Sequence, residues 1–486
     1  MIKMKLLLIN PRYNGRSEIP PLSLECLAAP LLAEGMEVSI LDLDICSEEE
    51  GHNSLSDMIL RLQPQILGVT AMSHSFPSAQ RVCSTARKLN QTMLTVMGGI
   101  HATVMSDEIL RENSHIDVCV RGEGEVTFRE LIHYFISGQA LSGIEGISYR
   151  ERGKITHNKD RALLRNLNEL PNPAHHIIRG EKYRTRGISS SRGCHHNCNF
   201  CSIQAQYHRT VRIRNAAAIA EEIRMLVHSG ARRIMFTDDN FTFSLKRIRE
   251  LCGLIECIGL AGKAEFYAEG RIDDICRNPI MASILSDTGF KGLYIGAESG
   301  SAEILDYYNK GTSPEDIIRG VAQCIEHNLT PVANFILFGP KDTIGTMKET
   351  IRLARQIFEM GAEIVYAETL IPYPGTPIQE SLASDGMFEE QQGIYYFRSY
   401  YGIEIEWVLR LCNIARAITE LLHREDKYFS YKKAYFELGY LDELLSGRIP
   451  TRFEEFYNQQ SSGERAVLPS KIEEIHRYIT ATIRNT

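Results

Sequence analysis

The chain lacks any run of apolar residues long enough to cross a membrane. A transmembrane helix needs about 20 consecutive apolar residues, and no apolar run in the 486 residues approaches that length. The short apolar stretch at the start reaches Asn10-Pro11 without the cleavage site that ends an export signal. We therefore expect a cytoplasmic protein with no membrane span.

A concentration of positive charge is also missing. The chain has 54 lysines and arginines against 61 aspartates and glutamates, a formal net charge of −7, and its basic residues are dispersed. Because nucleic-acid-binding surfaces gather basic residues on one face, we do not expect a nucleic-acid partner. The 43% of apolar residues is ample for two or three domains of about 150 residues each.

Regularly paired cysteines, the mark of a disulfide framework, are absent as well. The chain has 12 cysteines, which we expect to remain thiols in a reducing cytoplasm. Nine are scattered along the chain and are interpreted as buried thiols, namely Cys26, Cys46, Cys83, Cys119, Cys252, Cys257, Cys276, Cys324 and Cys412. The other three stand together.

Cys194, Cys198 and Cys201 form the pattern C-x-x-x-C-x-x-C, with the aromatic Phe200 just before the last cysteine. Four-iron clusters normally take four cysteines. Three thiolates on one tight loop can hold three corners, which leaves one iron with an open position where chemistry can occur. The pattern therefore predicts an iron–sulfur cluster with catalytic capacity.

A structural zinc site is an alternative interpretation of the triplet. It would take its fourth ligand from the nearby histidines, which are His195, His196 and His208. Zinc sites usually combine C-x-x-C pairs, and no second pair stands near the triplet. A chance grouping among 12 cysteines is the remaining alternative.

Residues 1–140 alternate short apolar runs with amphipathic segments. The pattern predicts strands at Lys5–Ile9, Glu37–Leu41, Gln65–Val69, Leu94–Met97 and Val118–Val120. It predicts helices at Leu22–Ala33, Leu55–Leu62, Ser78–Leu89, Asp107–Glu112 and Glu125–Phe135. This alternation is typical of an α/β domain with a doubly wound, Rossmann-like parallel sheet.

Glycines and small polar residues cluster at the predicted strand ends, in segments 10–11, 70–74, 98–103 and 121–125. Parallel sheets of this kind bind ligands beyond the carboxyl ends of their strands, and glycine there lets backbone approach a large flat or phosphorylated ligand. Ordinary turns also use glycine, but four such turns on one edge favour a ligand-binding edge. The candidate residues are Ser73, His74, Gly98, Gly99, His101, Gly122, Glu123 and Gly124.

Residues 141–185 connect this unit to a second one, through a hairpin at Gly146–Thr156 and a proline-punctuated linker. From 186 to 380, strands are predicted at Gly187–Ser190, Arg233–Thr237, Glu265–Ala268, Gly292–Ile295, Val332–Phe338 and Ile364–Thr369. Helices are predicted between them, for instance at Ala216–His228, Lys246–Ile258, Ile317–His327 and Thr346–Met360. Six such units predict a partial, TIM-like (β/α)6 barrel, and the cysteine triplet falls after its first strand, where parallel barrels carry their chemistry.

Polar residues follow the other predicted barrel strands, namely Asp238 and Asp239, Arg271, Glu298 and Ser299, and Gly339. The two aspartates could bind a ligand or cap the next helix. Arg271 could pair with a ligand carboxylate or form a plain surface ion pair. Glu298 brings a carboxylate to a strand end, and a carboxylate can accept two hydrogen bonds from adjacent donors. The proline-rich segment 372–377 must be a loop.

Residues 381–486 differ in character, because helical patterns such as Trp407–His423 dominate. The aromatic segment 395–401 could line a substrate tunnel or pack as part of a helical cap on the barrel. We expect a mostly helical C-terminal region.

These elements together resemble the cobalamin-binding radical S-adenosylmethionine (SAM) enzymes, which include class B methyltransferases and the anaerobic magnesium-protoporphyrin ester cyclases. The resemblance rests on the cysteine triplet, on 237–242 as a D-D-N-F element, and on segments 20–29, 98–103 and 122–125. One departure stands out. Many cobalamin domains carry D-x-H-x-x-G, whose histidine ligates cobalt, and this chain has no such string.

The resemblance implies a 4Fe–4S cluster, SAM and cobalamin as cofactors, with Glu298 at the ribose of SAM. It implies cleavage of SAM to methionine and a 5′-deoxyadenosyl radical, with electrons from an external reductant of the flavodoxin or ferredoxin type. The expected function is methylation of an unactivated carbon of a small-molecule substrate. Radical cyclisation, oxidation or ring rearrangement without methyl transfer is the alternative, and an iron–sulfur redox sensor is a third hypothesis.

Overall fold

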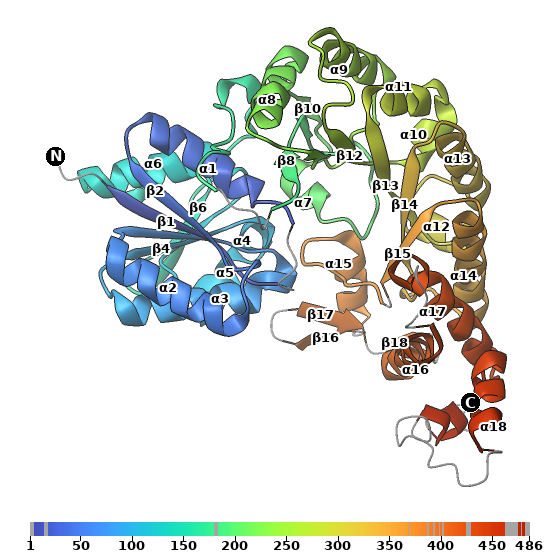
Figure 1. The fold of residues 1–486 in the computed structure, drawn as a ribbon. Coiled ribbons are helices and arrows are strands. Elements are labelled where there is room, and N and C mark those ends of the chain that lie inside the picture. The colour runs from blue at the N-terminus through green and yellow to red at the C-terminus, as the bar shows by residue number, and fades with distance from the viewer. Residues whose placement is uncertain are drawn as a thin grey trace.

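The chain folds into two α/β units that lie side by side, followed by a mostly helical region (Figure 1). The computed structural model describes residues 4–13, 18–178, 183–367, 369–385, 388–391, 394–397, 399–400, 403–423, 429–461, 475–477 and 479–481. No helix among these residues is long and apolar enough to cross a membrane.

The first unit, blue to cyan in Figure 1, is built on a seven-stranded sheet of order β2-β1-β3-β4-β5-β6-β7. Its strands are β1 Lys5–Asn10, β2 Glu37–Asp42, β3 Ile66–Thr70, β4 Leu94–Gly98, β5 Val118–Val120, β6 Ile147–Glu151 and β7 Lys154–His157. The first five are parallel, which confirms the predicted Rossmann-like sheet.

The hairpin β6–β7, which the sequence analysis placed in the connecting segment, extends this sheet with two antiparallel strands. Strand β6 pairs with β5 through Val118 and Tyr149 and buries Ile147 and Tyr149 in the core. It thereby covers an edge that β5 would otherwise leave unpaired. The hairpin was predicted correctly as an element, but its place in the sheet was not.

Helices cover both faces of the first sheet, as a doubly wound fold requires. Helices α1 Leu22–Ala33 and α6 Gly124–Ser137 share one core, and α2 Glu48–Leu62, α3 Phe76–Leu89, α4 Ile100–Val104 and α5 Ser106–Glu112 share the other. Helix α2 begins seven residues before its predicted start. Its first turns are polar and lack the apolar periodicity on which the prediction depended, but Ser47 and Glu50 form a capping box at the start of the helix.

The second unit, green to orange in Figure 1, has six parallel strands in the order β15-β14-β13-β12-β11-β8, which confirms the partial barrel. The strands are β8 Arg186–Ile188, β11 Arg233–Phe236, β12 Glu265–Gly270, β13 Phe290–Glu298, β14 Thr330–Ile336 and β15 Glu363–Ala367. The helices around them are α8 Ala216–His228, α9 Leu245–Cys257, α10 Ile272–Arg277, α11 Ile280–Thr288, α12 Ala302–Tyr307, α13 Pro314–Glu326, α14 Ile344–Glu359 and α15 Pro377–Ser384.

A small ladder lies at the start of this barrel and brackets the cysteine triplet. Strand β9 Ser191–Arg192 pairs antiparallel with β10 Arg212–Ile213, and the loop between them carries the three cysteines and the short helix α7 Ile203–Tyr207. The ladder thus closes the cysteine loop at its base, so both of its ends are fixed by backbone hydrogen bonds.

The C-terminal region is mostly helical, as predicted, with α16 Ile405–His423, α17 Phe429–Leu445 and α18 Thr451–Ser461. Two short antiparallel pairs precede these helices, β16 Phe388–Gln391 with β17 Ile394–Phe397 and β18 Ser399–Tyr400 with β19 Ile403–Glu404. The described part of the aromatic segment 395–401 therefore belongs to strands and not to a helical cap. The side chains of that segment lie outside the described ones, so its role as a tunnel wall stays a prediction.

Candidate functional site between the two units

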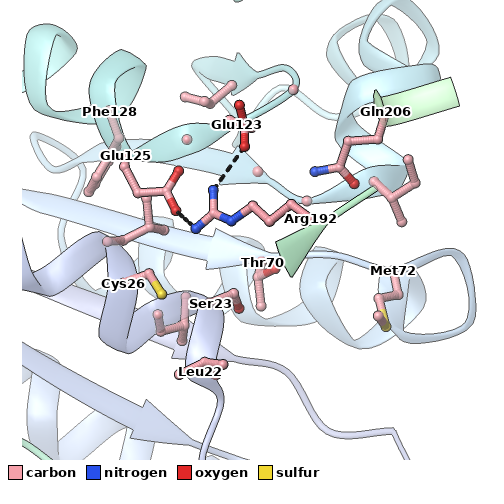
Figure 2. A pocket seen from close by; sticks show the side chains of 18 of the residues that line it. Leu22, Ser23, Cys26, Thr70, Met72, Glu123, Glu125, Phe128, Arg192 and Gln206 are labelled. Atoms are coloured by element: carbon pink, nitrogen blue, oxygen red, sulfur yellow. Dashed lines mark hydrogen bonds and ion pairs between the residues drawn. The ribbon is translucent and has the colours of Figure 1, made fainter. Parts of the chain in front are cut away.

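A cavity of about 450 Å³ lies between the carboxyl-terminal edge of the first sheet and the start of the barrel (Figure 2). From the first unit it is lined by helix α1, by the ends of β3 and β4, and by the loop after β5. From the second unit it is lined by the β9 region, helix α7, Thr237 and Asp239. Both predicted ligand edges therefore open into one space.

Five predicted residues of the first unit line this cavity, namely Gly98, Gly99, Gly122, Glu123 and Gly124. Gly122 has φ +69°, and a Cβ built there meets no protein atom within 4 Å. Gly99 has φ +94°, and a Cβ there would lie 2.6 Å from the Ala71 carbonyl oxygen. Gly122 therefore leaves open space, whereas Gly99 is required because a side chain would collide with Ala71. We call the glycines of this wall the glycine cradle, and the open space beside it fits a large flat ligand such as cobalamin.

Ser73, His74 and His101, predicted for the same edge, are not among the residues that line the cavity. His101 is 2% exposed, its Nδ1 lies 3.1 Å from Ser73 Oγ, and its ring packs on Phe76. Burial lowers the pKa of His101 to about 4, and the ring of His74 packs on Tyr13. The sequence pattern could not reveal that Ser73 and His101 are buried against each other and that His74 packs on Tyr13.

Glu123 lines the cavity, yet both of its carboxylate oxygens already have partners. Arg192 Nη1 donates to Oε1 at 2.9 Å, and Arg212 Nη1 donates to Oε2 at 2.6 Å. Arg192 also reaches Glu125 at 2.5 Å (Figure 2). Burial alone would raise the pKa of Glu123, but Arg212 and Arg192 hold it below its ordinary value.

We call these four residues, Arg192, Arg212, Glu123 and Glu125, the arginine clamp. The clamp joins the wall of the first unit to strand β9, two residues before Cys194. Glu123 therefore contributes to the site by fixing the cysteine loop against the cavity. The sequence analysis did not identify Arg192 or Arg212, and it included Glu125 only as part of the strand-end segment 121–125, because the pairing depends on how the units dock.

The three cysteines of the triplet share one loop, and each is free of disulfide bonds. Among the described residues, their Sγ atoms do not form a group within 4.8 Å of one another. A tetrahedral zinc site, with Zn–S bonds of about 2.3 Å, would bring its sulfurs to roughly 3.8 Å. At least one pair of these sulfurs therefore lies farther apart than a closed zinc site requires.

Burial is the main electrostatic feature of these thiols. It raises the pKa of Cys201 to about 11 and also raises the pKa of Cys194, and the neighbouring thiols add to both shifts. Thiols in this state bind a metal only by releasing protons. The loop is tight at its start, where Gly193 has φ +88° and its N–H donates to Asp239 Oδ2 at 2.6 Å.

The two aspartates after β11 have different roles. Asp238 is fully buried, accepts hydrogen bonds from Ser190 and Ser191, and pairs with Arg247. It fastens the ends of β8 and β9, and it does not cap helix α9, whose N-cap is Ser244. Asp239 lines the cavity, and burial raises its pKa to about 6. Of the pair, Asp239 is the residue available to a ligand.

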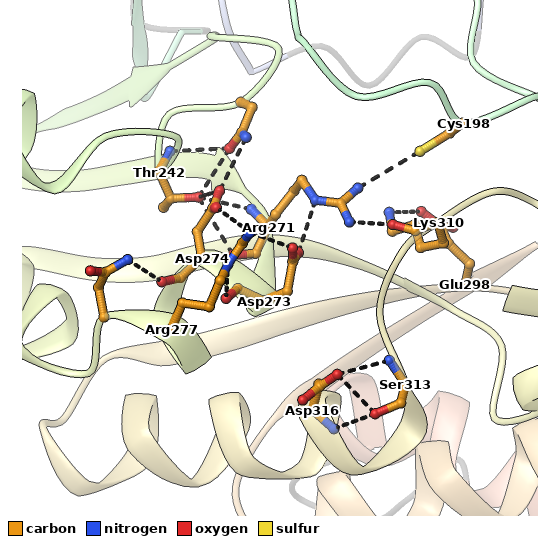
Figure 3. Close-up of polar contacts among 12 residues, drawn as sticks. Cys198, Thr242, Arg271, Asp273, Asp274, Arg277, Glu298, Lys310, Ser313 and Asp316 are labelled. Carbon is orange, nitrogen blue, oxygen red and sulfur yellow. Dashed lines mark hydrogen bonds and ion pairs between the residues drawn. The ribbon is translucent and has the colours of Figure 1, made fainter. Parts of the chain in front are cut away.

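Arg271 lies below the cysteine loop and is 6% exposed (Figure 3). Its Nη1 lies 3.7 Å from Cys198 Sγ, and its Nε donates to Asp273 Oδ1 at 2.8 Å. The alternative of a surface ion pair is therefore wrong, because the pair is buried. Contact with a SAM carboxylate stays a prediction.

Glu298 ends strand β13 in a left-handed conformation, φ +64°, next to an irregularity in the pairing with β14. It is buried and accepts a hydrogen bond from Lys310 Nζ at 2.8 Å. A strained conformation at a strand end often marks a ligand contact. The predicted contact with the SAM ribose would use the second carboxylate oxygen, and it stays a prediction.

Ser299, Gly339 and Phe200 have packing partners that the sequence did not reveal. Ser299 Oγ lies 2.8 Å from Thr350 Oγ1 in the core. Gly339 leaves no room for a side chain because a Cβ would collide with the Tyr308 hydroxyl. The ring of Phe200 packs edge-on against Tyr308 at 5.2 Å. Packing alone accounts for Ser299 and Gly339, and contact of the three residues with a ligand stays a prediction.

Glu269, on the interior side of strand β12, is a candidate that the sequence analysis missed. Phe266 and Ala268 of this strand are buried against helices, so Tyr267 and Glu269 face the barrel interior. Glu269 pairs in register with Tyr294. The surrounding protein and then the charge of Asp239 raise its pKa to about 7. The alternation along the strand could have predicted it.

The comparisons with known proteins agree with this geometry. Residues 14–132 match the family described as the B12 binding domain, and residues 188–354 match the radical SAM superfamily. An uncharacterised methyltransferase of Pyrococcus horikoshii is 33% identical over 78% of this chain and 83% of its own length. The chain belongs to the cobalamin-binding radical SAM family. It is a radical SAM enzyme, and its cofactors are a 4Fe–4S cluster, SAM and cobalamin.

Two further comparisons extend this result. The anaerobic magnesium-protoporphyrin IX monomethyl ester cyclase of Cereibacter sphaeroides is 26% identical over 78% of this chain and 64% of its own length. The cobalamin-dependent SAM radical enzyme OxsB, solved with aqua-cobalamin bound, has a TM-score of 0.74 at 18% identity. That comparison covers 100% of this chain and 80% of OxsB, and it shows the shared fold.

Proposed function

We propose that this radical SAM enzyme methylates an unactivated carbon of a small-molecule substrate. The observation that supports the proposal is the shared cavity, whose walls are the glycine cradle of the first unit and, in the second unit, strand β9, helix α7 and Asp239. The three cysteines lie in the same loop as helix α7. The bound cofactors would supply the radical that removes hydrogen and the methyl group that replaces it. A substrate between the two walls would be within reach of both.

The residues of the chain would bind, orient and exclude water. Cys194, Cys198 and Cys201 would hold the cluster, and the glycine cradle would hold the corrin ring. Asp239 and Glu269 would face the substrate from the barrel. The arginine clamp would keep the two walls at a fixed separation, which matters because a radical step requires the reacting atoms in near contact.

Transfer of label tests the proposal directly. The anaerobically reconstituted enzyme is incubated with methyl-labelled SAM, a reductant and candidate substrates. Label is expected in a product whose mass exceeds that of the substrate by one methylene unit. Cleavage of SAM with label retained only in SAM and its by-products, for every substrate consumed, would reject methyl transfer.

A second candidate is a radical cyclase or oxidase that uses the same cofactors without net methyl transfer. The relationship to the magnesium-protoporphyrin cyclases favours it. Product mass separates the two candidates, because oxidative cyclisation removes hydrogens whereas methylation adds a methylene unit.

We also propose that the electrons come from a protein of the flavodoxin or ferredoxin type in the cytoplasm. The twelve free cysteines suit a reducing compartment. Replacing a chemical reductant by purified flavodoxin or ferredoxin with its reductase should sustain SAM cleavage. If the chemical reductant sustains SAM cleavage but neither flavodoxin nor ferredoxin does, this choice of donor is wrong.

A further inference from the structure

The guanidinium of Arg271 occupies a buried position between the cysteine loop and helix α10 (Figure 3). Nη1 points at Cys198 Sγ, Nε donates to Asp273, and Nη2 donates to the Lys310 backbone carbonyl oxygen. Each nitrogen of the planar group thus has a partner. A guanidinium held at three points has little freedom to turn toward a different acceptor.

Further hydrogen bonds fix the backbone of Arg271. Its backbone N–H donates to Thr242 Oγ1 at 2.9 Å, and Thr242 Oγ1 in turn donates to Asp274 Oδ2 at 3.0 Å. Asn240 of the D-D-N-F element also donates to Asp274. This element therefore anchors helix α10 and the arginine that precedes it. The arrangement is a preorganised support and not a loose contact.

We propose that Arg271 is a positioning residue that donates a hydrogen bond to the Cys198 thiolate and thereby raises the reduction potential of the cluster. The inference rests on the cluster that the family assignment provides. Reduction adds negative charge to the cluster, and a hydrogen bond and positive charge at a ligating sulfur stabilise that charge. Because Arg271 is shielded from water, its effect is weakly screened.

The chain provides a matched control for this effect. Arg277 belongs to the same ion-pair network, with Nη2 at 2.6 Å from Asp273 and 2.8 Å from Asp274. It is 59% exposed, and among the described residues its hydrogen bonds and ion pairs go to Asp273 and Asp274 and to none of the three cysteines. Removing Arg277 perturbs the network and its net charge but leaves the hydrogen bond to Cys198 in place.

The test compares the reconstituted full chain with the R271Q and R277Q variants. The midpoint of cluster reduction is followed by electron paramagnetic resonance during a redox titration, with iron content and SAM affinity measured on the same samples. R271Q is expected to lower the equilibrium constant for reduction by about tenfold at a fixed potential, while R277Q leaves it near the parent value. SAM affinity is expected to change much less.

An unchanged midpoint in R271Q with four irons retained would overturn the proposal, and a selective loss of SAM affinity would assign Arg271 to the SAM carboxylate. If R271Q does not retain iron, R271K replaces it, because lysine keeps the charge but cannot hold three partners. A parent-like midpoint in R271K would mean that the retained positive charge, and not the fixed hydrogen bond to Cys198, sets the potential, which overturns the positioning role of Arg271. If the parent chain itself takes up no iron, the cluster assignment fails and not only the role of Arg271.

Discussion

The two walls of the shared cavity are built in opposite ways. The wall of the first unit is formed by glycines, and its polar side chains are turned away or paired. The wall of the second unit carries polar and charged side chains such as Arg192 and Asp239. The three cysteines lie in the same loop as helix α7 of this wall, with Arg271 in contact with Cys198. The first wall accommodates a ligand because its glycines have no side chains, and the second wall binds a ligand through side chains that are held in place. The predictions below are designed to disturb one wall while leaving the other intact.

The largest effect is expected from Cys198→Ala in the second wall. Removing one of three cluster ligands should reduce SAM cleavage by more than about 1,000-fold. Cobalamin content should stay near that of the parent, because the glycine cradle is unchanged. Iron analysis and detection of 5′-deoxyadenosine measure the loss.

Cys324→Ala is the control for that variant. Cys324 is a free, buried thiol of helix α13 in the same unit, so its removal tests whether any buried cysteine matters. If both variants lose iron equally, the assignment of the cluster to the triplet is wrong.

In the first wall, Gly122→Val should reduce cobalamin binding by more than about tenfold. The new side chain projects into the cavity, where no protein atom lies within 4 Å of its Cβ. Iron content and SAM cleavage without substrate should remain. Cobalt analysis and the cobalamin absorption spectrum measure the outcome.

Gly138→Val is the control for Gly122→Val, because both glycines have a positive φ and both substitutions strain the backbone equally. Gly138 ends helix α6 with φ +66° and open space around a built Cβ, but it does not line the cavity. Each substitution should cost about 1–2 kcal/mol of stability. Equal loss of cobalamin in the two variants would mean that strain, and not the filled cradle, is responsible.

The contact between the units should respond to pH through His175. Its Nδ1 lies 2.8 Å from Glu25 of α1 and its Nε2 2.9 Å from Glu222 of α8. Burial alone would lower the pKa of His175, but hydrogen bonds to Glu222 and Glu25 raise it to about 9. Because the folded pKa is raised, the stabilisation is complete below pH 6.5 and is lost as pH rises through 9, about 3 kcal/mol in all.

Chemical denaturation at pH 6 and pH 9.5 measures this loss. His175→Gln should flatten the dependence, whereas His52→Gln, an exposed position on α2, should leave it unchanged. A parent-like pH dependence in His175→Gln would rule out this origin.

The smallest effect is expected from Glu269→Gln at the barrel interior. With a pKa raised to about 7 by its surroundings, Glu269 should impose a rise of kcat/KM between pH 6 and pH 8 if its carboxylate receives a hydrogen bond from the substrate. In the variant, kcat/KM should no longer rise between pH 6 and pH 8, and it should be several-fold lower than in the parent. Glu265→Gln on the same strand, which removes a surface ion pair with Arg233, should keep the parent profile.

The strand and helix pattern of both units could be predicted because it depends on local periodicity. Helix α8 was predicted with its observed bounds, and each of the six barrel strands overlaps its prediction. The start of α2 and the membership of β6 were missed, because a polar capping turn resembles a loop and because edge pairing involves residues distant in sequence.

The candidate site also has a part that could be predicted from the sequence and a part that could not. Glycines at strand ends were found from the sequence, since backbone geometry alone makes them useful there. The partners of Glu123, Asp238 and Arg271 were not found, because Arg212, Ser190 and Cys198 lie 89, 48 and 73 residues away from them in the sequence. A side chain's type indicates what it can bind, but its neighbours decide what it does bind.

By itself, the sequence determined the two α/β units, the cysteine loop and the chemistry of its three thiols, since spacing and residue type suffice for these. Only the tertiary structure decided that both strand edges open into one cavity, that the arginine clamp joins its walls, and that Arg271 lies against Cys198. These contacts arise when the units dock, and the burial that makes their charges effective does not exist in the separate segments.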